Sequence, residues 1–418
     1  MTDTGANTLT AIMPKILARG LGTLRERCIM PRLVNSDYAI DAAKKGTTID
    51  VPVPVLVETQ DVDNQAVGTE KTSLTPTYVQ IPLDQWKQNK PIGLTDKDLC
   101  QIDATETFLP MQLEEAVKAL ANLVNVHIFS KYAGTNRGVY GFLCNNTNNV
   151  DAIGDPFAST GSTFTSGVSG ATGAKKILNV QLCPRTDRRG VLSFDAEANA
   201  LDLSQFSDAE KIMSAAVKME GEIGRKYGID WVADDAVPVH TRGTAFDTTR
   251  SKLTVGSGAA AQGDTSLMII DADNDSATVV PGDILTIANT LTADSQTYVV
   301  TESEAVILTS TSAGIEVDIQ PALKYAAAAG DVVTIANSHT VNLVFHRDAF
   351  AFASRPLLAN SSQYSLGNQM VSMQDPVTGL ILRLEVSRQH KQTVWEFDIL
   401  YGADLVRPEL AMRLAGAP

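Results

Sequence analysis

The chain has 418 residues, of which 44% are hydrophobic and 20% are charged. Such a length suits roughly two or three domains, each with a core of its own, and the composition lies far from that of disordered chains. The formal net charge of −14 excludes a protein whose whole surface binds the phosphates of nucleic acids.

The sequence carries no sign of secretion, membrane insertion or disulfide bonding. Its first residues lack the basic start and apolar run of a signal peptide, and no window holds the roughly 18 apolar residues of a membrane helix. The cysteines form no CxxC pair, which disfavours a disulfide framework or a zinc cluster. We therefore expect a protein of a reducing compartment, with buried thiols at Cys28, Cys100, Cys144 and Cys183.

Charge is distributed unevenly along the chain. Residues 251–340 hold two lysines and eleven acidic residues, a net charge of −9, so the rest of the chain carries only −5. Within residues 11–35 the sign reverses, because Glu26 is the single acid among five basic residues. These five are Lys15, Arg19, Arg25, Arg27 and Arg32. Composition thus separates a basic arm, a near-neutral body and an acidic module.

The first hundred residues predict a short helix followed by a long β hairpin. Within residues 11–27 the apolar side chains are spaced for an amphipathic helix, interrupted near its two glycines. Residues 47–57 and 78–83 alternate apolar with other side chains, as half-buried strands do. Prolines in the first of these remove backbone donors, which indicates an edge strand. The two strands are joined by the polar stretch of residues 58–77, which predicts a long projecting hairpin. Loops this long without internal structure are usually functional or mobile.

A long helix is predicted next. Its apolar residues recur at spacings of three and four over residues 110–132, which is one face of a helix. At about 1.5 Å per residue this segment would form a rod some 34 Å long. The residues on this face are Leu113, Val117, Leu120, Val124 and Ile128.

The middle of the chain is less defined. Residues 133–176 are rich in Gly, Asn, Ser and Thr and are predicted as loop. A strand is expected at residues 190–194. A capping box, in which Ser207 and Glu210 satisfy each other's backbone donors, predicts a helix that ends by Gly221. A glycine-punctuated turn then leads into a strand near residue 231.

From about Lys252 the periodicity is entirely β. Short apolar runs separated by Gly, Asp and Asn turns predict a small sandwich or barrel. Residues 281–289 and 329–337 are identical at six of nine positions, which indicates two turn-and-strand units of like shape. After residue 337 we expect a short helix around residues 347–355 and strands at 380–386 and 393–401. The acidic β module therefore interrupts a domain that resumes after it.

Patterns that carry chemistry are missing from the sequence. It holds no GxxxxGK phosphate loop, no GxSxG and no HExxH. Residues 271–275 begin like a calcium loop, but Ser276 and Gly282 stand where the turn glycine and the bidentate acid belong, so a solvated turn is expected. His240 and His346 lie in polar contexts without an identifiable partner for acid-base work. We expect no catalytic residue, cofactor or metal.

Short segments in a fixed order resemble the podophage coat-protein family typified by Salmonella phage P-twenty-two. Each segment is short, and the order of the segments over nearly the whole chain carries the resemblance. The segments are residues 24–35, 46–52, 83–86, 94–98, 115–121, 224–231, 237–241, 345–350 and 401–409. The module at residues 251–340 departs from the family, matching by position and β character more than by residues.

The resemblance implies an α+β protein with the Hong Kong 97-type phage capsid fold and an inserted small β-barrel or sandwich domain. The residue patterns described above predict like parts in the same order. The expected division is 1–36 for the N-arm, 37–103 for the E-loop hairpin and flanking strands, 104–135 for the spine helix, 136–249 for the P-domain and first part of the A-domain, 250–340 for the inserted acidic β domain, and 341–418 for the return through the A-domain and P-domain.

The resemblance also implies a function. Such a chain would be a major capsid protein that assembles with itself, as hexamers and pentamers, into an icosahedral shell. A scaffolding protein and a portal would be its partners, and packaged double-stranded DNA would be bound without sequence specificity. The protein would be located in the host cytoplasm during assembly and then in the virion. The inserted domain, with its charge of −9, would fold autonomously and face outward, away from DNA.

Two sets of residues are candidates for assembly contacts. The hairpin tip would lie across a neighbouring subunit by β-augmentation, with Asp63, Glu70 and Lys71 at the interface. The basic arm would face the shell interior, meeting scaffolding protein first and DNA later, although its arginines could equally stay solvated. Its residues are Lys15, Arg19, Arg25, Arg27 and Arg32.

Two rival functions remain open at this point. A tail-tube or adhesion subunit would also be acidic and without a catalytic site, but it does not need a long helix beside a long hairpin. An enzyme with dispersed catalytic residues is the second rival, which no single sequence excludes.

Overall fold

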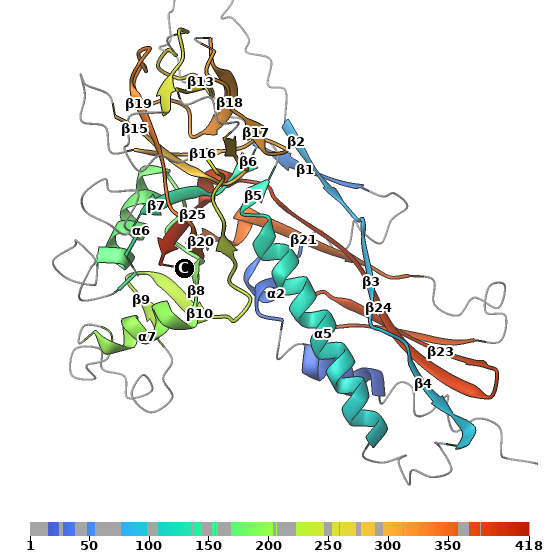
Figure 1. Ribbon diagram of the computed structural model, residues 1–418. Coiled ribbons are helices and arrows are strands. Elements are labelled where there is room, and N and C mark those ends of the chain that lie inside the picture. The colour runs from blue at the N-terminus through green and yellow to red at the C-terminus, as the bar shows by residue number, and fades with distance from the viewer. Residues whose placement is uncertain are drawn as a thin grey trace, which may run out of the picture. The chain divides into compact units, whose positions relative to one another are not determined.

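The structure of the protein is a computed structural model, drawn in Figure 1. It describes residues 16–24, 28–37, 48–54, 77–97, 108–134, 137–143, 153–154, 156–157, 169–203, 206, 223–245, 253–258, 260–272, 277–288, 296–311, 313–357, 368–376 and 378–417. The chain divides into two units. The first holds residues 1–27, 35–121 and 350–407, and the second holds residues 28–34, 122–349 and 408–418. The described helices and the mostly antiparallel sheets confirm the α+β class.

In the first unit, residues 16–24 are helical and confirm the described part of the predicted arm helix. Leu17, Leu21 and Leu24 are buried on one face. The expected interruption at the glycines was wrong, since the helix continues through both. A Cβ on Gly20 would lie 3.3 Å from the Val117 side chain, so glycine at this position allows the arm to pack closely against the long helix.

The predicted hairpin strands are confirmed where they are described. Strands β1 (Thr48–Val53) and β2 (Thr77–Pro82) pair antiparallel as a two-stranded sheet of their own. Alternate residues Ile49, Val51, Val79 and Ile81 are buried against Ala351 and Ala353 of β21 (Phe350–Arg355), while their neighbours face outward. Neither strand has another pairing partner among the described residues. The hairpin tip lies outside the described residues.

The larger sheet of the first unit is built on β24 (Gln392–Leu405), a strand of 14 residues. It pairs antiparallel with β3 (Gln85–Gln88), β4 (Ile92–Thr95), β21 (Phe350–Arg355) and β23 (Ile381–Gln389), and β23 in turn pairs with β22 (Gln369–Gln374). The predicted strands at 380–386 and 393–401 are therefore confirmed. The predicted helix around 347–355 was wrong beyond a 3-10 turn, η1 (Arg347–Ala349).

The long helix is confirmed as α5 (Phe108–Ser130), 23 residues in length. The residues predicted for its apolar face, from Leu113 to Ile128, are each at most 2% exposed. Near its end Asn125 donates a 3.2 Å hydrogen bond to the buried carboxyl of Asp234. No helix among the described residues is both long and apolar enough to cross a membrane.

The second unit contains a seven-stranded mixed sheet. Its order is β7 (Tyr140–Leu143), β25 (Ala411–Gly416), β20 (His339–His346), β8 (Arg188–Leu192), β10 (Ile229–Ala233) and β9 (Gly224–Lys226), with β11 (Val239–His240) pairing on β20. Every residue of β20 and β25 is buried. These two strands form the centre of the core. Residues 411–416 are thus held inside the sheet.

Several elements of the second unit were missed or misplaced by the sequence. The segment predicted as loop contains β5 (Ala133–Gly134), β6 (Arg137–Gly138), β7 and the start of helix α6 (Ser169–Val180). The strand expected at 190–194 ends at Leu192, because Ser193 caps helix α7 (Phe194–Asp202) by accepting from the amide of Ala196. The short helix α2 (Met30–Leu33) was also missed. The helix predicted from Ser207 falls outside the described residues.

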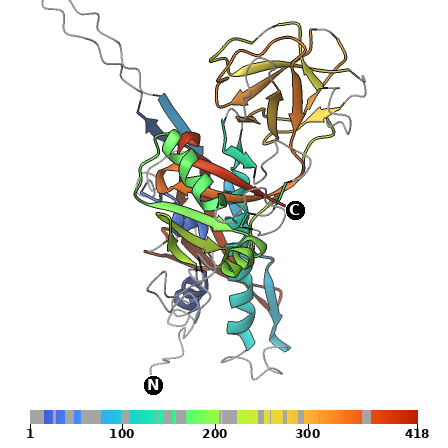
Figure 2. The same cartoon turned by 90° about the vertical axis from the view of Figure 1, so that its left-hand side faces the viewer.

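The acidic module forms a closed barrel, the second of the two predicted alternatives. Figure 2 shows its strands curling around a common core. The order is β12 (Leu253–Val255), β13 (Ser266–Asp271), β18 (Ile315–Gln320), β16 (Thr297–Val300), β15 (Ile284–Ala288) and β19 (Val332–Ile335), with β14 (Thr278–Val279) and β17 (Val306–Ile307) as a separate pair. Whether the barrel folds by itself stays a prediction.

The internal sequence repeat has a structural counterpart in this barrel. Its two strands, β15 and β19, pair antiparallel with Thr286 opposite Thr334, and the two hydroxyl oxygens are 2.7 Å apart. Because these threonines hold equivalent places in the repeat, the two units are related by a local two-fold axis between them. The second residue of each repeat copy is a glycine of positive φ, 91° at Gly282 and 89° at Gly330, as such tight turns require.

Candidate functional site

The residues predicted to make assembly contacts fall mostly outside the described part of the chain. This applies to the hairpin residues Asp63, Glu70 and Lys71 and to the arm residues Lys15, Arg25 and Arg27. Arg19 and Arg32 are described, and they belong to different units. Of these eight residues only Arg19 and Arg32 are described, so the assembly contacts stay a prediction.

The two described arm arginines differ in their partners. The Arg19 guanidinium, 63% exposed, forms an ion pair with Glu114 on α5. The charge of Arg19 thus has a partner within the subunit, and the role of the arm in assembly stays a prediction. Arg32 is exposed, and its backbone carbonyl accepts a 2.9 Å hydrogen bond from Arg189. The side chain of Arg32 is therefore accessible to a partner.

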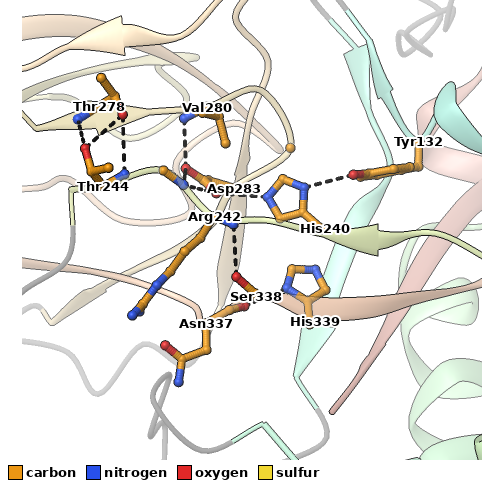
Figure 3. Close-up of polar contacts among 12 residues, drawn as sticks. Tyr132, His240, Arg242, Thr244, Thr278, Val280, Asp283, Asn337, Ser338 and His339 are labelled. Atoms are coloured by element: carbon orange, nitrogen blue, oxygen red, sulfur yellow. Dashed lines mark hydrogen bonds and ion pairs between the residues drawn. The ribbon is translucent and has the colours of Figure 1, made fainter. Parts of the chain in front are cut away.

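A buried polar cluster that the sequence did not predict lies where the barrel joins the mixed sheet (Figure 3). Tyr132, just after α5, lies with its hydroxyl 2.9 Å from Nδ1 of His240. The other ring nitrogen of His240 is 2.9 Å from Oδ1 of Asp283, in the turn before β15. His240 is 4% exposed and Asp283 is fully buried. One chain of hydrogen bonds thus connects the helix end, the sheet and the barrel.

Arg413 supplies positive charge to the same cluster. It lies on β25, is completely buried, and donates 2.8 Å to the carbonyl oxygen of Gly282. Its guanidinium carbon lies 5.2 Å from the centre of the Tyr132 ring, within range of a cation–π contact. Nη1 of Arg413 lies 3.4 Å from Nε2 of His339. Nδ1 of His339 lies 2.8 Å from the carbonyl oxygen of Asn337.

The protonation of this cluster follows from its burial. Burial lowers the pKa of His240, against the smaller raising effect of its hydrogen bond to Asp283. Burial and the charge of Arg413 lower the pKa of His339 to about 2. Burial likewise lowers the pKa of Arg413, to about 10, which leaves it charged at neutral pH. Both histidines are therefore neutral, and Arg413 provides the positive charge near the Asp283 carboxylate.

The neutral state fixes the direction of each hydrogen bond. The hydroxyl of Tyr132, whose pKa is raised by burial, donates to Nδ1 of His240, and Nε2–H donates to Asp283. Asp283 also accepts from the backbone amides of Val280 at 2.8 Å and Gly243 at 3.2 Å. Both nitrogens of His240 are thus occupied by protein partners, and this buried cluster links the end of α5, the mixed sheet and the barrel.

The partners of His240 could not be predicted from the sequence, because Tyr132, Asp283 and Arg413 are distant from it along the chain. His346, the other histidine considered, is buried, and its Nδ1 accepts a 3.2 Å hydrogen bond from the amide of Asp348. Among the described residues no group of three His, Cys, Asp or Glu side chains is placed to hold a metal ion.

No family model matches the sequence, and no curated protein matches it. Similar solved structures include one titled "Mycobacterium phage Che8", with 14% identity, 91% of this chain and 88% of that chain covered, and a TM-score of 0.47. A second, the capsid of the cyanophage P-SCSP1u, has 13% identity, coverage of 89% and 84%, and a TM-score of 0.47. A virus-like particle from Pyrococcus furiosus has 7% identity, coverage of 96% and 97%, and a TM-score of 0.40. At these values the likenesses are distant and decide nothing about this chain.

Proposed function

We propose that the chain is the major capsid protein of a tailed bacteriophage, with a Hong Kong 97-type fold, and that it assembles into an icosahedral shell around double-stranded DNA. The order of its elements supports this proposal: a basic helical arm, an isolated hairpin, a helix of 23 residues, a mixed sheet interrupted by a barrel, and a return into both units. The residues that resemble the podophage coat-protein family lie along the same order of elements.

The observation that carries the proposal is the β1–β2 sheet. Among the described residues both of its edges lack a pairing strand. Unpaired edges are sites of association with other chains, and natural monomers cover or blunt them. Pro52 and Pro82 lie within these strands and remove two donors, so a partner strand would have to pair around them. A neighbouring subunit would use the donors and acceptors that the prolines leave on these edges.

Deleting residues 63–72 is expected to leave a folded subunit that does not form shells. The deletion removes the proposed contact residues Asp63, Glu70 and Lys71 but keeps every described residue of β1 and β2. Far-ultraviolet circular dichroism and thermal unfolding test the fold, and sedimentation velocity tests assembly. Shells of normal yield from the deletion variant would contradict the proposed role of the hairpin.

The partners belong to the same proposal. Subunits would associate as hexamers and pentamers, first with a scaffolding protein and a portal in the host cytoplasm and then around DNA in the virion. The exposed side chain of Arg32 supports a contact between the arm and an anionic partner. The side chain of Arg19 instead forms an ion pair with Glu114 of the same subunit. The net charge of −9 over residues 251–340 supports an outward-facing barrel, since it would repel DNA.

A further inference from the structure

The barrel is joined to the rest of its unit by two neighbouring chain crossings. The chain enters from β11 and leaves into β20, and these strands pair with Val239 opposite Thr340 and His240 opposite His339. The amide of Arg242 adds a 3.2 Å hydrogen bond to Ser338 (Figure 3). We call residues 239–245 and 337–340 the neck. A barrel held only by two adjacent strands could swivel about them, so other contacts must fix its position.

Asp283 makes several of those contacts from the barrel side, together with Thr278, which is hydrogen-bonded to Thr244 and Ala245 of the neck. Its carboxylate accepts from His240 and Gly243 of the neck, and His240 accepts in turn from Tyr132. The preceding residue, Gly282, accepts from Arg413 through its carbonyl. A Cβ on Gly282 would lie 2.7 Å from Cβ of Ala133 and 3.2 Å from the ring of His240, so the turn is seated directly against its neighbours.

The second unit of the internal repeat provides a comparison within the same molecule. Asp331 is the equivalent of Asp283, and each carboxylate accepts from the amide three residues earlier, at 2.8 Å for Asp283 and 2.9 Å for Asp331. Each turn also exchanges two backbone hydrogen bonds with one residue of a neighbouring strand, Val300 for the first and Val255 for the second. The two aspartates therefore perform the same task in closing a turn.

The two turns differ in what lies outside the barrel. Among the described residues Asp331 makes side-chain hydrogen bonds only within the barrel, and a Cβ on Gly330 would meet nothing within 4 Å. Of the two aspartates, Asp283 alone reaches the neck. The hydrogen bonds of Asp283 to His240 and Gly243 are thus additional to those that close its turn. Among the described residues Asp331, in the second copy of the repeat, has no equivalent bonds.

We propose that Asp283 is a positioning latch, which holds the barrel in one orientation on the mixed sheet by binding the neck, and that removal of its carboxylate frees the barrel to move while leaving it folded. The latch acts together with the apolar cluster of Ile284, Val299, Ala336 and Ala415. Hydrogen bonds from Gly138 to Gln320 and from Thr297 to Gly141 also limit how far the freed barrel moves. The inference is independent of the proposed capsid function, because it concerns the unassembled subunit.

Hydrogen–deuterium exchange on the unassembled full-length chain tests the latch, with Asp331→Asn as the matched control. For Asp283→Asn we expect amide exchange in the neck to become about 10- to 100-fold faster, since hydrogen bonds to a charged group are among the strong ones, while β13 and β18 keep their protection. For Asp331→Asn we expect faster exchange near residues 328–331 and none of this change in the neck.

Equal exchange patterns in the two variants would show that Asp283 is only a turn residue and would overturn the proposal. Loss of protection in β13 and β18 together with the neck would do the same, because the barrel would then depend on Asp283 for its fold. If Asp283→Asn does not accumulate as folded protein, His240→Gln decides. Faster exchange confined to the neck supports the latch, and unchanged exchange contradicts it.

Discussion

Replacing Arg413 by methionine is expected to lower the free energy of unfolding by about 3–5 kcal/mol, the usual cost of removing one partner from a buried charged network. Methionine keeps an unbranched apolar stem but removes the charge that faces Asp283 and the donor bound to Gly282. A buried carboxylate would then lack positive charge, and a buried carbonyl would lack its donor. Urea unfolding of the unassembled subunit, followed by tryptophan fluorescence, measures the change.

Arg388→Met is the control for this variant. Arg388 is 66% exposed and forms an ion pair with Asp96, 44% exposed, and such surface pairs contribute about 0–1 kcal/mol. A loss of less than about 1 kcal/mol in Arg413→Met, similar to the control, would mean that the charge of Arg413 is not needed in the buried cluster.

Acidification is expected to destabilise the subunit from about pH 6.5 downward, partly through the two buried histidines. The folded-state pKa values of His240 and His339 lie below the ordinary value of 6.5, that of His339 at about 2. Below pH 6.5 the unfolded chain therefore binds protons that the folded chain does not, and stability falls with pH. The histidine contribution is thus complete above this pH and is lost below it, for His339 by about 1.4 kcal/mol per pH unit.

His339→Gln isolates one of these contributions. Between pH 6 and pH 5 the variant is expected to lose stability less steeply than the natural chain, by about 1.4 kcal/mol per pH unit. His390→Gln, in the exposed turn between β23 and β24, is the control for replacing a histidine outside the buried cluster. Parallel slopes for the natural chain and His339→Gln would show that His339 takes up a proton in the folded state.

The sequence predicted those elements whose pattern is local. Alternation in β1 and β2 and the helical spacing in α5 each recur within a few residues, so one face of each element could be assigned. Strand β21 gave no such pattern, because Phe350, Ala351, Phe352 and Ala353 are all buried, as in strands covered on both faces. A helix was predicted around residues 347–355, and only the 3-10 turn Arg347–Ala349 formed before this strand.

The helices that were missed bury small side chains. In α6 the buried residues include Ala171, Ala174 and Leu178, and two glycines lower its intrinsic helix propensity. In α7 only Ala196 and Ala200 are buried, so its apolar stripe is faint. A signal was present at its start, where Ser193 is followed by Asp195 and Glu197 in the first turn, the acidic side chains that a helix N-terminus favours.

The buried cluster could not be predicted, because it depends on how the sheet and the barrel close. Tyr132, His240, Asp283 and Arg413 come from four separate parts of the chain, and each looks unremarkable in its own segment. The repeat did indicate that Asp283 and Asp331 occupy like turns. It could not indicate that one of these turns packs against the neck, since that difference comes from neighbours outside the repeat.

Electron microscopy of the purified natural chain, alone and mixed with a scaffolding protein, tests the proposed function most directly. We predict closed shells of uniform size, formed by the chain alone or once the scaffolding protein is added. Persistent monomers under both conditions, or open tubes in place of shells, would contradict a capsid function.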